Sequence, residues 1–182
     1  LSPVANRRTD GYGGSLENRM RFALEVAREV RRCWPEDKPL FFRVSAVDDS
    51  GWTIEDSITL AGRLEACGVD VIDCSAGGML ETASPVESPR YGYQVKFAEQ
   101  IRAQAGIMTM AVGMIIHADQ ANEILAGGKA DLVSIGRERL HNPNWPLDAA
   151  QKLGIDSPFA VVPPSCGYWL EKRAGNREIC PS

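Results

Sequence analysis

Two apolar, strand-like runs end in glycine, and a cation follows the second glycine directly. The run 132–135 ends at Gly136 and Arg137, and the run 107–112 ends at Gly113. A glycine lacks a Cβ, so an anionic group can approach its backbone N–H, and the dipole of a following helix adds to the attraction. An arginine beside it can add charge-assisted, bidentate hydrogen bonds. The pattern favours a phosphate-binding site over the alternative, in which the glycines only form tight turns and Arg137 is a surface charge.

A second candidate for ligand contact is Arg43, which interrupts the apolar run 39–46. Strand alternation places its side chain on the same face as Phe41 and on the opposite face from Phe42. A guanidinium group inside a core is costly unless it meets an anion or electron-rich acceptors. We therefore expect Arg43 to contact a ligand. The alternative is a side chain that snorkels at a strand edge or pairs with Asp73.

The remaining reactive side chains give weaker signals. Cys74, in the run 69–78, has no histidine placed as a base, so a small buried thiol is expected rather than a nucleophile. Ser75 can donate a hydrogen bond to a ligand or to the neighbouring loop. His117 and His141 have no partner at metal-ligand spacing, so no metal site is expected.

Composition narrows the class of protein. The 182 residues, 44% hydrophobic and 24% charged, are typical of a globular domain with one core. A net charge of -4 and a pI near 5.3 argue against a nucleic-acid partner, which needs a basic surface. No apolar run approaches the ~20 residues that cross a bilayer, so no membrane association is expected. The 5 cysteines are odd in number and form no Cys-x-x-Cys pair, which favours reduced thiols in a cytoplasmic protein.

The elements that must position these residues are read from hydrophobic periodicity and capping signals. A helix is predicted over 16–34, capped by Ser15, with Met20, Leu24, Ala27 and Val30 on its inner face. After it, strands are predicted over 39–46, 69–78, 107–112 and 131–135, and helices over 53–68, 94–104, 119–126 and 142–153. The first of these helices is capped by Thr53, with Asp56 three residues later. The segment 79–92 is predicted to be a long loop.

Strict alternation of short strands and helices predicts an α/β fold with a parallel sheet. Near-continuous apolar strands indicate that both faces of the sheet are covered. No G-x-G-x-x-G follows the first strand, so a (β/α)8 TIM barrel is favoured over a doubly wound sheet. A barrel has eight strands, and about four β/α units are predicted here, so residues 1–154 form a half barrel and 155–182 a C-terminal tail. The lack of an initiator Met also suggests that the chain begins partway through a longer protein.

Six segments resemble, in order and spacing, the old yellow enzyme family of flavin oxidoreductases, particularly its bacterial, thermophilic-like branch. They are "LSPVANRRTDGYGGSLENRMRF", "FFRVSA", "GVDVIDCSAG", "YQVKFAEQIR", "TMAVGMI" and "ADLVSIGRERLHNPNW". The resemblance covers about residues 1–154. It implies an FMN-containing TIM barrel that uses NADPH or NADH to reduce activated carbon–carbon double bonds, such as those of enones.

The resemblance also assigns roles to single residues. Arg43 matches the arginine that faces the N1/C2=O edge of the isoalloxazine and stabilises negative charge on reduced flavin. Gly113, Gly136 and Arg137 match the phosphate cradle. The residues expected to bind the cofactor are Arg43, Ser75, Gly113, Met114, Gly136 and Arg137. The family's substrate-binding His/His or His/Asn pair and its proton-donating tyrosine lie upstream of the matching segment, so no residue of this chain is assigned as catalytic.

A half barrel has two open sheet edges and an uncovered apolar interior. We therefore expect a homo-oligomer, or association with the missing N-terminal half of the barrel. In related members a C-terminal arginine reaches a neighbouring subunit's site; Arg173, near Tyr168 and Trp169, either does this or is an exposed tail residue. Two alternatives stay open. One is a self-associating half barrel that binds no flavin, and the other is a different phosphate-binding barrel enzyme, which would keep the glycines but not the lead-in "NRRTDGYGGSLENR".

Overall fold

A computed structural model of the chain describes residues 1–48, 51–77 and 90–176. The elements, in order, are α1 (Leu16–Cys33), β1 (Phe41–Ser45), α2 (Ile54–Glu65), β2 (Val71–Ser75), α3 (Val95–Ala105), β3 (Met108–Ala111), α4 (Ala118–Ala126), β4 (Leu132–Val133), α5 (Arg137–His141), α6 (Trp145–Lys152), the 3-10 helix η1 (Pro158–Val161) and α7 (Pro164–Ala174). The segment predicted as a long loop, 79–92, lies mostly outside the described residues.

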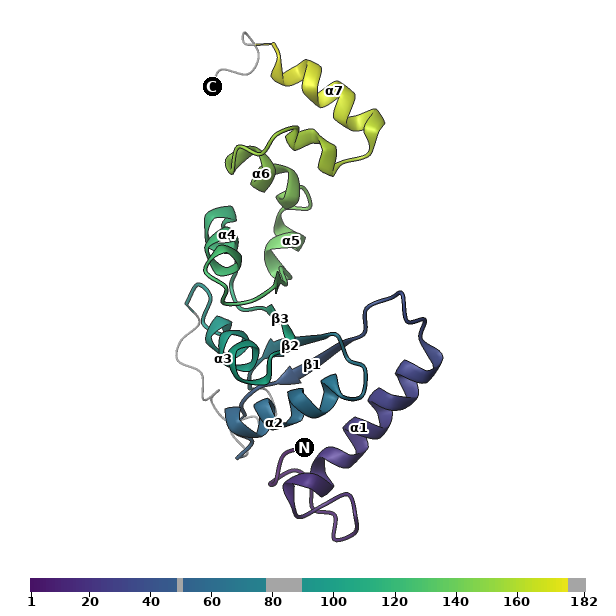
Figure 1. Ribbon diagram of the computed structural model, residues 1–182. Helices are drawn as coiled ribbons and strands as arrows, with labels where there is room; N and C mark the ends of the chain where they lie inside the picture. Colours follow the sequence, from purple (N-terminus) through teal and green to yellow (C-terminus); the bar gives the residue numbers. More distant parts are fainter. Residues whose placement is uncertain (49–50, 78–89, 177–182) are drawn as a thin grey trace.

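The four strands form one parallel sheet in the order β1-β2-β3-β4. Each strand therefore pairs with the strand that follows it in sequence, with a helix between them, as the alternating pattern predicted. The register sets Arg43 of β1 beside Asp73 of β2, and Asp73 beside Met110 of β3. Residues aligned in this way project from the same face of the sheet. In Figure 1, α2 and α3 lie close to the sheet.

The first two helices begin at the predicted caps. Ser15 accepts a hydrogen bond from the backbone N–H of Asn18, and Thr53 forms a reciprocal capping box with Asp56. The inner face predicted for α1 is confirmed at Met20, Leu24 and Ala27, which are buried. Val30 is 40% exposed, so its assignment to that face was wrong.

The hydrophobic core lies on one face of the sheet. Leu60 and Leu64 of α2, Ile101 of α3 and Ile72 of β2 are fully buried there. The opposite face is partly open, because Phe41, Met108 and Leu132 are 43%, 49% and 36% exposed. Phe41 and Met108 both align with Val71, and Leu132 aligns with Met110, so all three belong to the face that carries Arg43. The expectation that both faces are covered is therefore wrong for the described part of this chain, whereas the uncovered apolar interior expected of a half barrel is confirmed there.

The C-terminal third differs most from the prediction. β4 contains only Leu132–Val133, shorter than the predicted 131–135, and among the described residues it pairs with β3 alone. The short helix α5 follows it, where no helix was predicted. The tail contains η1 and α7, and Figure 1 shows α6, η1 and α7 extending away from the sheet. None of the described helices is long and apolar enough to span a membrane.

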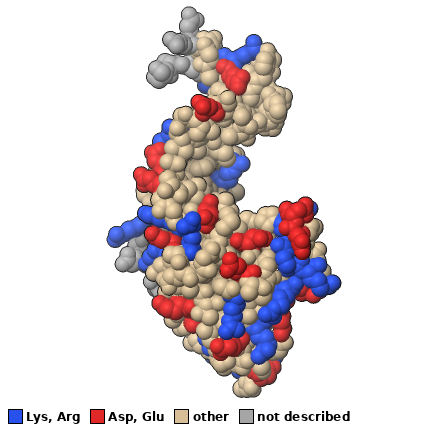
Figure 2. Space-filling model, in the orientation of Figure 1, with Lys and Arg blue, Asp and Glu red and all other residues tan. Residues whose placement is uncertain are grey.

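Charge is distributed unevenly along the molecule. Figure 2 shows acidic and basic side chains close together around the α1 end and more widely spaced over the C-terminal arm, residues 137–176. The exposed apolar side chains of that arm are Leu140, Leu153, Ile155, Val161, Tyr168 and Trp169.

Candidate functional site

A pocket of about 690 Å³ lies at the carboxyl ends of the four strands. This is the edge at which parallel α/β sheets bind their ligands. All six residues predicted to bind a cofactor line it, namely Arg43, Ser75, Gly113, Met114, Gly136 and Arg137. The structure thus brings together residues that are up to 94 positions apart, from Arg43 to Arg137. Their role in cofactor binding stays a prediction.

The two glycines present backbone rather than side chains to this pocket. Gly113 has a φ of 120°, and a Cβ there would lie 3.1–3.2 Å from atoms of Gln94 and Tyr93. A side chain at Gly136 would meet no heavy atom within 4 Å, so the space beside it is open. Within the described residues, neither glycine N–H donates a hydrogen bond. Two unpaired N–H donors and open space beside Gly136 suit an anionic group.

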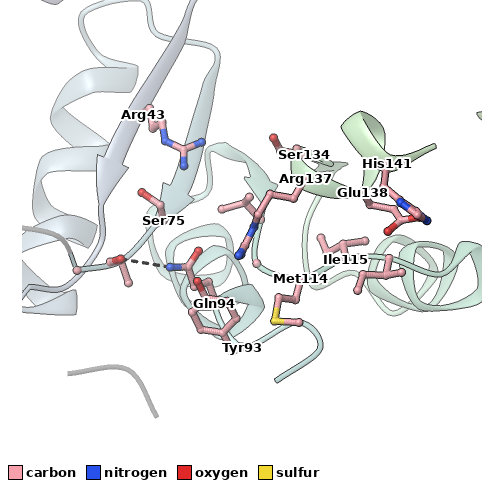
Figure 3. A pocket seen from close by; sticks show the side chains of 16 residues that line it. Arg43, Ser75, Tyr93, Gln94, Met114, Ile115, Ser134, Arg137, Glu138 and His141 are labelled. Atoms are coloured by element: carbon pink, nitrogen blue, oxygen red, sulfur yellow. Dashed lines mark hydrogen bonds between the residues drawn. The ribbon is translucent and has the colours of Figure 1, made fainter. Parts of the chain in front are cut away.

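Arg137 is the first residue of α5, and its side chain extends into the pocket toward Tyr93 and Gln94 (Figure 3). Among the described residues it forms no ion pair. The next residue, Glu138, also lines the pocket, but it projects with His141 on another side in Figure 3. Arg137 is therefore a cation within the pocket whose hydrogen-bonding capacity is available to a ligand.

Arg43 is held differently. Its Nη1 donates a hydrogen bond to Asp73 Oδ2 at 2.6 Å, and its side chain is 55% exposed. The predicted placement on the face of Phe41 is confirmed by the register. The guanidinium is not a lone buried charge, however, because the alternative pairing with Asp73 is present. Arg43 still lines the pocket, so the two interactions are compatible.

Ser75 ends β2, and its hydroxyl donates to the carbonyl oxygen of Val44 at 2.9 Å. The acceptor belongs to β1, so the hydrogen bond expected to the neighbouring loop is replaced by one to the adjacent strand. Its oxygen keeps acceptor capacity toward the pocket, where Ser75 is a lining residue.

Sequence reasoning missed five polar pocket residues, one of which, Ser134, directly follows β4. Tyr93 and Gln94 come just before α3, and Glu138 and His141 lie on α5. Gln94 is 5% exposed, and its Nε2 donates to the carbonyl oxygen of Ala76 at 3.2 Å. A usable signal existed for Tyr93 and Gln94, because the last residues of a βα loop lie at the same sheet edge as the strand ends. No such signal existed for His141, since α5 itself was not predicted.

Cys74 is fully buried on the helix-covered side of β2. Burial raises the pKa of its thiol to about 12, and the nearby charge of Asp73 contributes to the shift. The expected inert thiol is therefore confirmed. Within residues 1–48, 51–77 and 90–176, no group of three or more His, Cys, Asp or Glu side chains is arranged to hold a metal ion.

The arrangement can bind an elongated anionic ligand. The glycines and Arg137 would hold a phosphate at one side, and Arg43 would present positive charge elsewhere on the pocket wall. These features fit the phosphate and the ring of FMN, the cofactor implied by the sequence resemblance.

Comparison with known proteins agrees with this geometry. The sequence profile described as "NADH:flavin oxidoreductase / NADH oxidase family" matches residues 1–155. An NADPH dehydrogenase of Halalkalibacterium halodurans is 48% identical over 156 residues, which cover 85% of this chain and 45% of that protein. An NADPH dehydrogenase of Bacillus subtilis is 49% identical over 163 residues, covering 88% of this chain and 47% of that protein.

Solved structures give the same fold. Morphinone reductase in complex with tetrahydroNAD superposes with a TM-score of 0.63 at 30% identity, covering 85% of this chain and 39% of that one. An old yellow enzyme homologue from Zymomonas mobilis has a TM-score of 0.64 at 22% identity, covering 83% and 42%, and supports the fold alone. The chain thus spans less than half the length of these relatives, and its four-stranded parallel sheet is part of a TIM barrel. On this evidence the chain belongs to the NADH:flavin oxidoreductase / NADH oxidase family.

Proposed function

We propose that this chain supplies the cofactor-binding half of an FMN-dependent NAD(P)H oxidoreductase that reduces activated carbon–carbon double bonds, such as those of enones. Its substrate-binding pair and proton donor are expected outside the matched segment. We assign residues 1–154 to the barrel half and residues 155–182 to a C-terminal tail.

One observation carries the proposal. Residues from β1, the end of β2, the turn after β3 and the start of α5 converge on one pocket, and they combine two unpaired glycine N–H groups with an arginine that forms no described ion pair. An uncharged ligand would leave the positive charge of Arg137 without a partner in the pocket. A phosphate uses both features at once, because the N–H groups and the guanidinium donate to different oxygens.

Different residues of this chain would contact different parts of FMN. Arg137 and the backbone N–H groups of Gly113 and Gly136 would bind the phosphate. Met114, with a φ of 50°, follows Gly113 in the turn after β3 and would contact the cofactor from the pocket wall. Arg43 would lie toward the ring and favour negative charge there. When bound, FMN supplies the hydride-transfer chemistry, which no side chain of the protein can perform alone.

The proposal is tested by titrating FMN with the purified chain and following quenching of flavin fluorescence. Saturable binding at one site per chain is expected. Adding NADPH or NADH then shows, by bleaching of the flavin absorbance, whether the bound flavin of this half accepts hydride. Turnover with an enone is expected only of the complete barrel, because the substrate-binding pair and the proton donor are expected outside this chain. If a folded sample shows no saturable binding of FMN, the proposed cofactor site is contradicted. Binding without any bleaching would limit this chain to cofactor binding.

The open face of the sheet supports a second proposal, that the chain on its own associates with a second copy. Phe41 and Met108 are exposed on that face, and β1 and β4 are its unpaired edges within the described residues. Exposed apolar surface and open edges favour association. A second four-stranded half would provide the strand number of a closed barrel.

Sedimentation equilibrium of the chain alone tests this second proposal. A dimer is expected, and substituting Met108 with Lys should weaken it, because the charge would lie in the apolar contact. Leu125→Lys, on a 40% exposed residue of α4, is the matched control and should leave the association unchanged. A well-folded monomer at high concentration would contradict the proposal.

A further inference from the structure

Arg43 and Asp73 form a pair in which only one partner reaches the pocket. β1 and β2 place the two residues side by side, and Arg43 Nη1 lies 2.6 Å from Asp73 Oδ2. Arg43 lines the pocket and is half exposed, whereas Asp73 is absent from the lining and is 7% exposed. Asp73 therefore lies beneath Arg43, too deep to touch a ligand itself.

The Asp73 carboxylate has fewer hydrogen-bond partners than a buried carboxylate usually has. Its Oδ1 is buried and has no hydrogen-bond partner among the described residues. Val71 and Met110, its neighbours on the same face, are apolar. A buried carboxylate with an unpaired oxygen costs stability, and an apolar side chain of similar size would pack there at lower cost. The ion pair with Arg43 is the interaction that offsets this cost.

A carboxylate in this position also changes what Arg43 presents to the pocket. The bond to Oδ2 uses one N–H and restricts rotation of the guanidinium, while the remaining donors stay available. The negative charge of Asp73 also offsets part of the positive charge at the pocket wall. Burial makes this effect stronger than it would be in water.

We propose that Asp73 is a positioning residue, which fixes the Arg43 guanidinium against the pocket wall and attenuates its positive charge there. Together the two residues set how strongly the pocket favours a negatively charged ring over a neutral one. This inference rests on the proposed function, because the ring in question is that of FMN.

The positioning is tested without any cofactor. Nitrogen-15 NMR of the apo chain should show slow rotation of the Arg43 guanidinium, and an Arg43→Lys sample assigns the signal by its loss. Arg63, an exposed residue of α2, provides a freely rotating reference in the same spectrum. Asp73→Asn keeps the size of the side chain but removes its charge, so the Arg43 signal should become averaged. If the wild-type Arg43 signal is as mobile as that of Arg63, the proposal is overturned, even when the variant does not fold.

The charge effect is tested on the FMN complex by equilibrium reduction against a reference dye. Asp73→Asn should raise the affinity for reduced relative to oxidised FMN by at least about tenfold, equivalent to about 30 mV for the two-electron couple. Asp131→Asn is the matched control, because it disrupts another Arg–Asp pair, with Arg102 at 3.0 Å, away from the pocket. It should leave the potential unchanged. An unchanged potential in Asp73→Asn would overturn the proposal. Absence of FMN binding in the wild type would defeat the proposed function instead, while the NMR result would still decide whether Asp73 holds Arg43.

Discussion

Trp52 Nε1 donates a hydrogen bond of 2.7 Å to Ser57 Oγ, and that hydroxyl donates in turn to the carbonyl oxygen of Ala46 at 2.7 Å. Both side chains are buried, at 2% and 1% exposure. Because Ala46 directly follows β1, this relay ties the start of α2 to the strand that carries Arg43.

Replacing Ser57 with Ala should therefore destabilise the fold. The buried indole N–H of Trp52 and the carbonyl of Ala46 would both lose their partner, at a cost of about 1–3 kcal/mol. The free energy of unfolding from urea denaturation measures the effect. Thr59→Ala is the control, since its exposed hydroxyl only donates to the carbonyl of Glu55 on its own helix. Equal stability of Ser57→Ala and wild type would show that the relay contributes nothing.

Arg137→Ala should weaken FMN binding without unfolding the chain. Its side chain is exposed and forms no described ion pair, so the fold does not depend on it. Loss of a charge-assisted hydrogen bond to phosphate costs about 1.5–3 kcal/mol, or roughly a 10- to 150-fold rise in Kd. Fluorescence titration of FMN measures this, and Arg63→Ala, an exposed arginine outside the pocket, is the control. If Arg137→Ala binds FMN as the wild type does, the phosphate is held elsewhere.

Gly136→Ala tests whether a ligand approaches the backbone at this residue, because the substitution should change ligand affinity without changing the stability of the fold. An added Cβ meets no protein atom within 4 Å, so the free energy of unfolding should change by less than about 0.5 kcal/mol. The methyl group would instead occupy the space through which a phosphate approaches the N–H. FMN affinity should fall while the urea midpoint stays constant. Gly62→Ala, on α2 with equally open space, should leave affinity unchanged. Wild-type affinity in Gly136→Ala would exclude close approach at this residue.

Local patterns predicted the fold well where a helix is long and strongly capped. Thr53 with Asp56 marked the start of α2, and Ser15 marked the start of α1, because these side chains satisfy helix N–H groups regardless of the rest of the chain. The alternation of strands and helices was enough to predict the parallel order. Local pattern alone did not predict exposure, because Phe41 and Met108 stand in apolar runs that are typical of covered strands. Only the count of about four β/α units indicated that this face of the sheet would be left open, as it is among the described residues.

The sequence predicted that the glycines and arginines would line the candidate site, but it did not predict the other polar residues that line it. Gly136 and Arg137 stand out because a glycine and a cation directly follow an apolar run. His141 gave no signal, because its place in the pocket depends on α5, a five-residue helix too short to show a period. The pairing of Arg43 with Asp73 depends on the register of two strands 30 positions apart, which the sequence could suggest only as an alternative.

The reactivity of each cysteine toward alkylating reagents should follow the burial of its thiol. Cys33 and Cys166 are exposed, whereas Cys74 is buried and its pKa is raised to about 12. Alkylation requires the thiolate and access to it. At about pH 8 iodoacetamide should therefore modify Cys33 and Cys166 much faster than Cys74, as measured by mass spectrometry of the peptides. Cys74 should react readily once urea unfolds the chain.

The raised pKa of Cys74 also determines how its thiol changes the free energy of unfolding at high pH. The unfolded thiol ionises near its ordinary pKa of 9.0, while the folded one stays protonated until about 12. In that window the folded state binds more protons, so the free energy of unfolding should fall as the pH rises from about 9 toward 12. Cys74→Ala should flatten that part of the profile, whereas Cys33→Ala, at an exposed thiol, should not. A profile unchanged by Cys74→Ala, together with labelling of Cys74 as fast as Cys33, would mean that the helix-covered side of β2 opens to solvent readily in solution.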